Sequence, residues 1–295
     1  MKSHILLSIL IFLFVLIATS AGIFYQTSGS PIEYTTVRGE QAVTQGSGLY
    51  RYDPGWFARE GVVWDSINLL FGLPLFAGAI YLSQQDSLRG RLLLGGLLFY
   101  FFYVYLMATT GYAFNHLFLV YVAIFALSGV AFFLNLHGID VARLPERVSS
   151  RFPRRLFIAF TFAMGFLLIF LWCGRILPNM AHDGLPPDVA GLNTLVSHGI
   201  DLGMVVPLML ATGIILWRRS PWGYLLAGVS LSYGLMMCIT LPAFIAVPLI
   251  QDGKINLIEA SPLLVLCLIG LVLSGMFFGN VREEGTSWRA ERNRL

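Results

Sequence analysis

The sequence predicts an all-α integral membrane protein with about eight transmembrane helices, a parallel four-plus-four internal repeat and a small β-type cap on the outer side. The chain is 57% hydrophobic and only 12% charged, whereas about 25% of a soluble domain is charged. Helices suit a bilayer because they satisfy their own backbone groups. Eight apolar stretches are long enough to cross about 30 Å of hydrocarbon: residues 5–25, 62–83, 92–110, 117–136, 156–177, 199–217, 224–250 and 262–281.

The distribution of Lys and Arg predicts the orientation of these helices. With the N-terminus inside, fourteen of the 19 basic residues fall on the cytoplasmic side, as the positive-inside rule requires. We therefore expect a multi-pass protein of the plasma membrane with both termini in the cytoplasm. The first stretch could also be a cleaved signal peptide, but it is longer than a signal core and the repeat requires it, so we expect a retained helix.

A shift of 133 residues places the second and third predicted helices on the sixth and seventh. The matches include prolines, glycines and a tyrosine, which have positional roles, although similar composition alone is the alternative explanation. The aligned pairs are Pro74 with Pro207, Gly90 with Gly223, Gly95 with Gly228 and Tyr100 with Tyr233. The predicted organisation is a first half at 1–136, a cytoplasmic loop at 137–155, a second half at 156–281 and a cytoplasmic tail at 282–295.

The predicted outer segment at 26–61 contains short β-type runs between glycines and prolines. This punctuation favours one or two hairpins. A small cap over the outer face is therefore expected.

Several polar residues fall where a membrane helix would be apolar, and intramembrane ionisable groups mark functional sites. Two pairs, Asp65 with Asn68 and His198 with Asp201, are spaced three apart on one helix face. If the two halves meet along a central axis, these side chains converge near the outer surface. The predicted ligand-binding residues are Asp65, Asn68, His116, Arg175, His198 and Asp201.

Two other interpretations of these residues stay open. Acids near the start of a helix cap its free N–H groups, and Arg175 near a helix end suits the dipole. A metal site formed by His116, His182, His198, Asp183 and Asp201 lacks the spacing of a known motif, so no metal ligand is predicted.

Pro74 and Pro207 lie about half-way along their predicted helices at matching positions. Proline removes a backbone donor and frees a carbonyl, so these two residues are predicted hinges. The seventh stretch contains Pro242 and Pro248, so it is not expected to be one straight helix.

Other motifs narrow the possible functions. The sequence has no Walker A motif, no GxSxG and no haem-attachment motif, so no cofactor is indicated. The net charge of +3 reflects basic residues at the inner membrane surface and does not imply nucleic-acid binding.

Three motifs carry a resemblance: the run Leu49-Tyr-Arg-Tyr-Asp53, the Pro-Leu pair at Pro74, and Asn115-His-Leu-Phe118 leading into Tyr121. They resemble a family of uncharacterised prokaryotic multi-pass membrane proteins, over most of the chain. The resemblance implies a polytopic fold and no particular site residues.

The leading hypothesis is a transporter, channel or solute-binding membrane protein with an outward-facing polar site between two similar halves. Its expected partners are the lipid bilayer and a small solute or ion, and an oligomer is compatible with it. One alternative is a membrane-embedded enzyme, metal-dependent or not, that acts on a lipid or lipid-linked substrate. Another is a membrane scaffold or sensor subunit. A cavity between the halves would favour the first.

Overall fold

The computed structural model describes residues 2–149, 151–180, 184, 186, 189–252 and 257–283. Within this part of the chain, eight helical stretches are long and apolar enough to cross a membrane, which confirms the predicted multi-pass architecture. They are Ser3–Phe24, Gly55–Gln84, Leu88–Gly111, Phe118–His137, Arg154–Met180, Val196–Trp217, Pro221–Ala246 and Ala260–Asn280.

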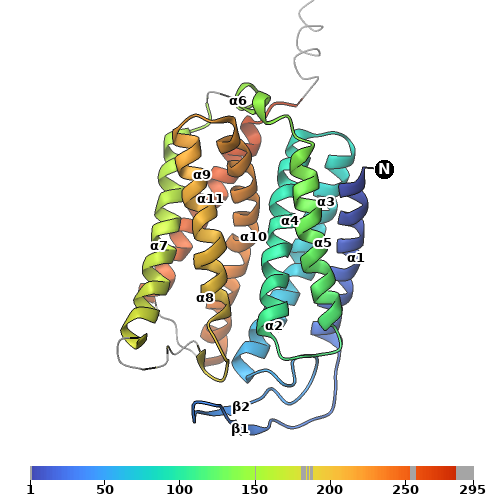
Figure 1. The fold of residues 1–295 in the computed structure, drawn as a ribbon, viewed down its shortest axis with the longest axis vertical. Helices are drawn as coiled ribbons and strands as arrows, with labels where there is room; N and C mark the ends of the chain where they lie inside the picture. Colours follow the sequence, from blue (N-terminus) through green and yellow to red (C-terminus); the bar gives the residue numbers. More distant parts are fainter. Residues whose placement is uncertain are drawn as a thin grey trace, which may run out of the picture.

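The helices form two groups that lie side by side (Figure 1). The first group contains α1 (Ser3–Phe24), α2 (Gly55–Ile67), the π-helical turn η1 (Asn68–Gly72), α3 (Leu73–Gln84), α4 (Leu88–Gly111) and α5 (Phe118–His137). The second group contains α7 (Arg154–Met180), α8 (Val196–Ile200), the π-helical turn η4 (Asp201–Val205), α9 (Val206–Trp217), α10 (Pro221–Asp252) and α11 (Leu257–Asn280). The two groups meet mainly where α4 packs against α10.

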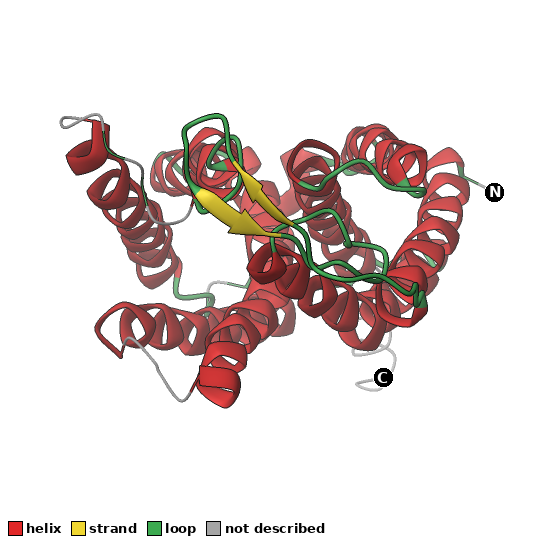
Figure 2. Cartoon of the chain, turned by 90° about the horizontal axis from the view of Figure 1, so that it is seen from below, coloured by secondary structure: helices red, strands yellow, loops and turns green. Residues whose placement is uncertain are grey.

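The two ends of the molecule differ. One end carries η2 (Val141–Arg143), α6 (Leu144–Arg147) and the start of α1, and we call it the α6 end. The other carries the hairpin of β1 (Glu33–Thr35) and β2 (Gln41–Val43), whose strands pair antiparallel. The predicted β-type segment therefore exists as one hairpin, which lies across the helix ends (Figure 2).

Side-chain hydrogen bonds fasten this hairpin end to the second group. The Tyr34 hydroxyl donates to the carbonyl of Gly191 at 3.0 Å. The Trp56 indole donates to the carbonyl of Ala190 at 2.8 Å. The segment before α8 is thus held against both the hairpin and the start of α2.

The structure differs from the sequence prediction at two helices. α2 begins at Gly55 rather than near residue 62. Hydropathy missed its first two turns because they carry Arg59 and Glu60, although they bury Phe57 on one face. α10 runs unbroken through Pro242 and Pro248, so these prolines do not divide it into two helices. Neighbouring helices can satisfy the backbone groups that proline frees within a membrane helix.

The prolines at the predicted hinges each follow a π-helical turn. Leu73, directly before Pro74, donates its N–H to the carbonyl of Asn68 five residues back. Val206, directly before Pro207, donates in the same way to Asp201. A π-turn widens the helix and is frequent at functional sites, so both stretches change pitch beside a polar residue.

Close packing of α4 against α10 depends on Gly96. A methyl group built on Gly96 would lie 2.1 Å from Cβ of Ser232 and 2.7 Å from the carbonyl oxygen of Val229. Small residues allow membrane helices to approach this closely. Just beyond this contact, the rings of Tyr100 and Tyr233 face each other with centroids 6.5 Å apart.

We expect Gly96→Leu to lower the melting temperature of the purified protein in detergent, because the added side chain must push α4 away from α10. Overpacking of this kind costs about 1–3 kcal/mol. Gly78→Leu is the matched control, because nothing lies within 4 Å of a Cβ at this exposed helical glycine. Equal melting temperatures for the two variants would contradict the role given to Gly96.

Candidate functional site

A cavity of about 220 Å³, which we call the chamber, lies within the second group of helices and against α2 and α4 of the first. Two acids line it, Glu60 and Asp201. It extends from Ser197, in α8, to Ser230, in α10. Ser230 lies roughly 14 Å along the axis of α10 from the first residue of that helix. The rest of its wall is rich in aromatic and methionine side chains, namely Trp64, Tyr103, Phe160, Trp172, Tyr233, Phe244, Met107, Met164, Met209 and Met237.

The Asp201 carboxylate in the chamber wall accepts a hydrogen bond at each of its two oxygens. It is buried at the first position of η4. The Tyr103 hydroxyl donates to Oδ1 at 2.9 Å, and the Trp172 indole donates to Oδ2 at 3.0 Å. Tyr103 comes from the first group and Trp172 from the second, so Asp201 joins the two.

Trp172 contacts three of the predicted site residues, Asp201, His198 and Arg175. Its ring lies 3.9 Å, centroid to centroid, from the buried His198 ring. The Arg175 guanidinium lies 5.7 Å from its centroid. With its hydrogen bond to Asp201, Trp172 therefore contacts each of these side chains. Sequence reasoning missed this residue, because nothing distinguishes one tryptophan in an apolar helix from a packing residue.

Asp65 lies apart from the chamber lining. The Tyr50 hydroxyl donates to its Oδ2 at 2.6 Å, and a Cβ built on Gly22 of α1 would lie 1.7 Å from the same oxygen. Asp65 is thus enclosed between α1 and the segment before α2. It also lies ten residues inside a helix that starts at Gly55, so the interpretation of Asp65 as a helix cap is wrong.

Asn68 is buried in a third environment. The Tyr100 hydroxyl donates to its Oδ1 at 2.8 Å. The Trp64 ring lies 6.3 Å from that of Tyr100 and 6.5 Å from that of Tyr103, so it contacts the tyrosine partners of both Asn68 and Asp201. The structure therefore groups Asp201, His198 and Arg175, and it gives Asp65 and Asn68 separate partners.

The remaining predicted residues occupy other places. His116 is exposed in the segment before α5. His182 and Asp183, which entered the metal hypothesis, lie outside the described residues. Among the residues that are described, no three His, Cys, Asp or Glu side chains form a group that could hold a metal ion. Pro74 and Pro207 are each the second residue after a π-turn, as described above.

Asp53 is a further buried acid, in the turn that precedes α2. Its Oδ1 accepts a hydrogen bond from the backbone N–H of Ala113 at 2.7 Å, which ties this turn to the end of α4. Burial raises the pKa of Asp53 to about 7, and the N–H of Ala113 opposes the rise. This carboxyl group therefore changes charge near neutral pH.

No protein-family model, curated protein or solved structure matches this chain. The resemblance to prokaryotic multi-pass membrane proteins therefore stays a prediction. Assignment of the site depends on its geometry and chemistry.

We expect the stability of the protein to fall between pH 5 and pH 8 in a way that depends on Asp53. The native state holds this proton to about pH 7, whereas the unfolded chain loses it near 3.8. The resulting stabilisation is complete below the unfolded pKa and is lost as the pH rises through the folded pKa. The contribution is at most about 1.4 kcal/mol per pH unit.

Asp53→Asn keeps the acceptor for Ala113 and removes the titration, so its melting temperature should fall less over this range than that of the wild type. Asp140→Asn, at an exposed carboxylate near the α6 end, should leave the slope unchanged. The same slope in wild type and Asp53→Asn would contradict the assignment.

Proposed function

We propose that this chain is a solute-binding membrane protein of the transporter class, and that its chamber takes an amphipathic organic cation. The observation that carries the proposal is the buried Asp201 carboxylate, held by Tyr103 and Trp172 in the wall of a cavity that lies within the second group and is closed on one side by α2 and α4 of the first. The protein orients a charge in a place where a carboxylate is costly unless it has partners.

The charge of the lining favours a cation. Glu60 and Asp201 are acidic, and among the described residues that line the chamber there is no Lys, Arg or His. A carboxylate with two donors still has acceptor capacity, because each oxygen carries more than one lone pair. A positively charged group can therefore approach Asp201 without displacing Tyr103 or Trp172.

The aromatic lining favours a solute with an apolar body. Trp64, Trp172 and Tyr233 present ring surfaces beside the acids, and aromatic faces attract organic cations. Methionines from α4, α7, α9 and α10 supply adaptable apolar contacts. A small aromatic or alkyl ammonium ion matches this combination better than a free sugar or an anion.

We assign roles to the predicted site residues on this basis. Asp201 contacts the solute, and His198 and Arg175 position Trp172. Asp65 and Asn68 stabilise the first group through Tyr50 and Tyr100, a role supported by their hydrogen bonds. We assign no role to His116.

The prolines are proposed as hinges of the chamber. Asp201 and Val205 begin and end η4 and both line the cavity. A change between π-helical and α-helical hydrogen bonding ahead of Pro207 would therefore turn Asp201 relative to Trp172. Such a local change is one way in which a transporter exposes and withdraws a site.

We also propose that the two groups arose by duplication, and local geometry at the 133-residue shift supports this. Both π-turns and both following helices start and end at equivalent positions. The next turns have positive φ at equivalent residues, 58° at Asp86 and 59° at Arg219. In both turns the backbone N–H of a serine, Ser87 or Ser220, donates a hydrogen bond to the carbonyl oxygen five residues back, with an N···O distance of 3.2 Å.

We further propose that the α6 end faces the cytoplasm of a plasma-membrane protein, because most Lys and Arg residues lie at that end. To test this, Glu33→Cys and Arg151→Cys are made in a chain in which Cys173, Cys238 and Cys267 are replaced. A membrane-impermeant maleimide should label Glu33→Cys in intact cells and Arg151→Cys only after lysis. Labelling of both in intact cells would overturn the orientation.

The solute class is tested with phenyltrimethylammonium and benzenesulfonate, two water-soluble probes of similar size and opposite charge. We expect saturable binding of the cation to purified protein, seen by equilibrium dialysis and by a change in tryptophan fluorescence. Asp201→Asn should weaken this binding at least about tenfold, equivalent to about 1.4 kcal/mol, because the buried charge partner is lost.

Asp65→Asn is the matched control, since Asp65 is an equally buried acid that does not line the chamber. It should leave cation affinity unchanged. Equal binding of benzenesulfonate, or equal losses in the two variants, would contradict a cation site at Asp201.

A further inference from the structure

A second hollow lies at the α6 end, between α7 and α9, far along both helices from the hairpin. It measures about 480 Å³. We propose that this groove binds an anionic phospholipid, with the headgroup phosphate on its arginines and the acyl chains along the outer faces of α7 and α9. Its lining consists of Arg154, Arg155, Ile158, Phe162, Trp217 and Arg219.

The polar part of the groove has one sign of charge. Its three arginines come from the start of α7 and from the turn between α9 and α10, and none of the described residues that line it is acidic. Two ion pairs at this end of the molecule, Lys2 with Asp86 and Arg143 with Asp140, do not involve these arginines. Guanidinium groups bind phosphate oxygens in bidentate fashion.

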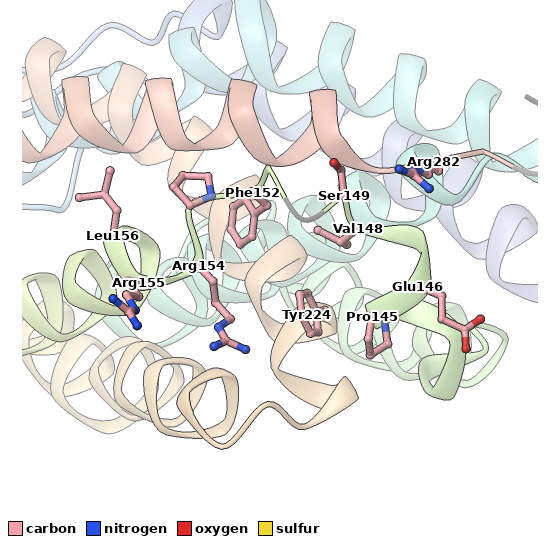
Figure 3. A pocket seen from close by; sticks show the side chains of 11 residues that line it. Pro145, Glu146, Val148, Ser149, Phe152, Arg154, Arg155, Leu156, Tyr224 and Arg282 are labelled. Carbon is pink, nitrogen blue, oxygen red and sulfur yellow. The ribbon is translucent and has the colours of Figure 1, made fainter.

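An adjoining hollow of about 830 Å³ extends the basic surface (Figure 3). Arg154 and Arg155 line both hollows, and Arg282 and Tyr224 line the second. Figure 3 shows Arg154 and Tyr224 on the same side of this hollow. One acid, Glu146, also lines it, which leaves the groove between α7 and α9 as the more positive of the two.

The apolar part of the groove argues for a lipid rather than a free phosphate. Ile158 and Phe162 follow Arg154 and Arg155 along α7, and the next exposed aromatic residue on this helix is Phe166. Arg154 and Phe166 are separated by roughly 18 Å along the helix axis. A molecule that fills this path has a charged head at the membrane boundary and a long apolar tail.

Trp217 and Arg219 indicate where the headgroup would lie along the helix axis, at the membrane–water boundary. Trp217 is 70% exposed at the end of α9, as expected of an indole at a membrane–water interface. Arg219 follows two residues later. At the equivalent turn of the first group, Asp86 takes the place of Arg219 and pairs with Lys2.

The test uses native mass spectrometry of the full chain in a neutral maltoside detergent. The probes are phosphatidylglycerol, phosphatidylcholine with the same acyl chains, and inorganic phosphate. Wild type should retain phosphatidylglycerol in preference to phosphatidylcholine. The double variant Arg155→Gln/Arg219→Gln should lower the bound fraction at least fivefold.

Arg151→Gln/Arg218→Gln is the matched control, because both arginines are exposed at the same end and line neither hollow. It should bind phosphatidylglycerol as wild type does. Should the first double variant fail to fold, the single variants Arg155→Gln and Arg219→Gln carry the test, each with a partial loss.

Three results would overturn the proposal. Equal retention of phosphatidylcholine would show that charge is not recognised. Displacement of the lipid by inorganic phosphate at equal concentration would indicate a soluble-phosphate site. Equal losses in the two double variants would show that the positive surface as a whole, rather than this groove, attracts the lipid.

Discussion

The arrangement of the chamber depends on the need to satisfy a carboxylate that lies inside an apolar helix bundle. An unpaired polar group in such surroundings costs several kcal/mol. Asp201 meets this need with one donor from each helix group, Tyr103 and Trp172. Tyr103 belongs to α4, the same helix that packs closely against α10 at Gly96. One helix therefore takes part both in the packing at the centre of the molecule and in the hydrogen bonding of the chamber.

The same helix serves both π-turns. Asn68 and Asp201 each begin a π-turn ahead of a proline, and each accepts a hydrogen bond from a tyrosine of α4. Tyr100 and Tyr103 are three residues apart, so their side chains share a helix face. α4 is also the most buried of the eight spans. α4 therefore holds one polar turn in each group through a hydrogen bond from one of its tyrosines.

Hydropathy predicted the spans and the multi-pass class, because the cost of exposing polar backbone to lipid leaves few alternatives. Intramembrane charge also directed attention to Asp65 and Asp201. The sequence did not distinguish their environments, since Asp65 is enclosed by Tyr50 and Gly22 while Asp201 borders a cavity. That difference depends on side chains distant in the chain. The early start of α2 and the unbroken α10 were missed because charge and proline content describe residues singly, whereas neighbouring helices decide whether they are tolerated.

Under the proposed duplication, the two groups differ where function would require it. In the first group α1 packs along α5, whereas the corresponding α7 and α11 make little contact and the chamber lies beside them. At the paired π-turn position the first group has the neutral Asn68 and the second group, which contains the chamber, has Asp201. An amide suits a filled interior, because it needs hydrogen bonds but no counter-charge. A carboxylate suits an interior with room for a cation, so the difference at this one position supports assigning structural support to the first group and ligand binding to the second.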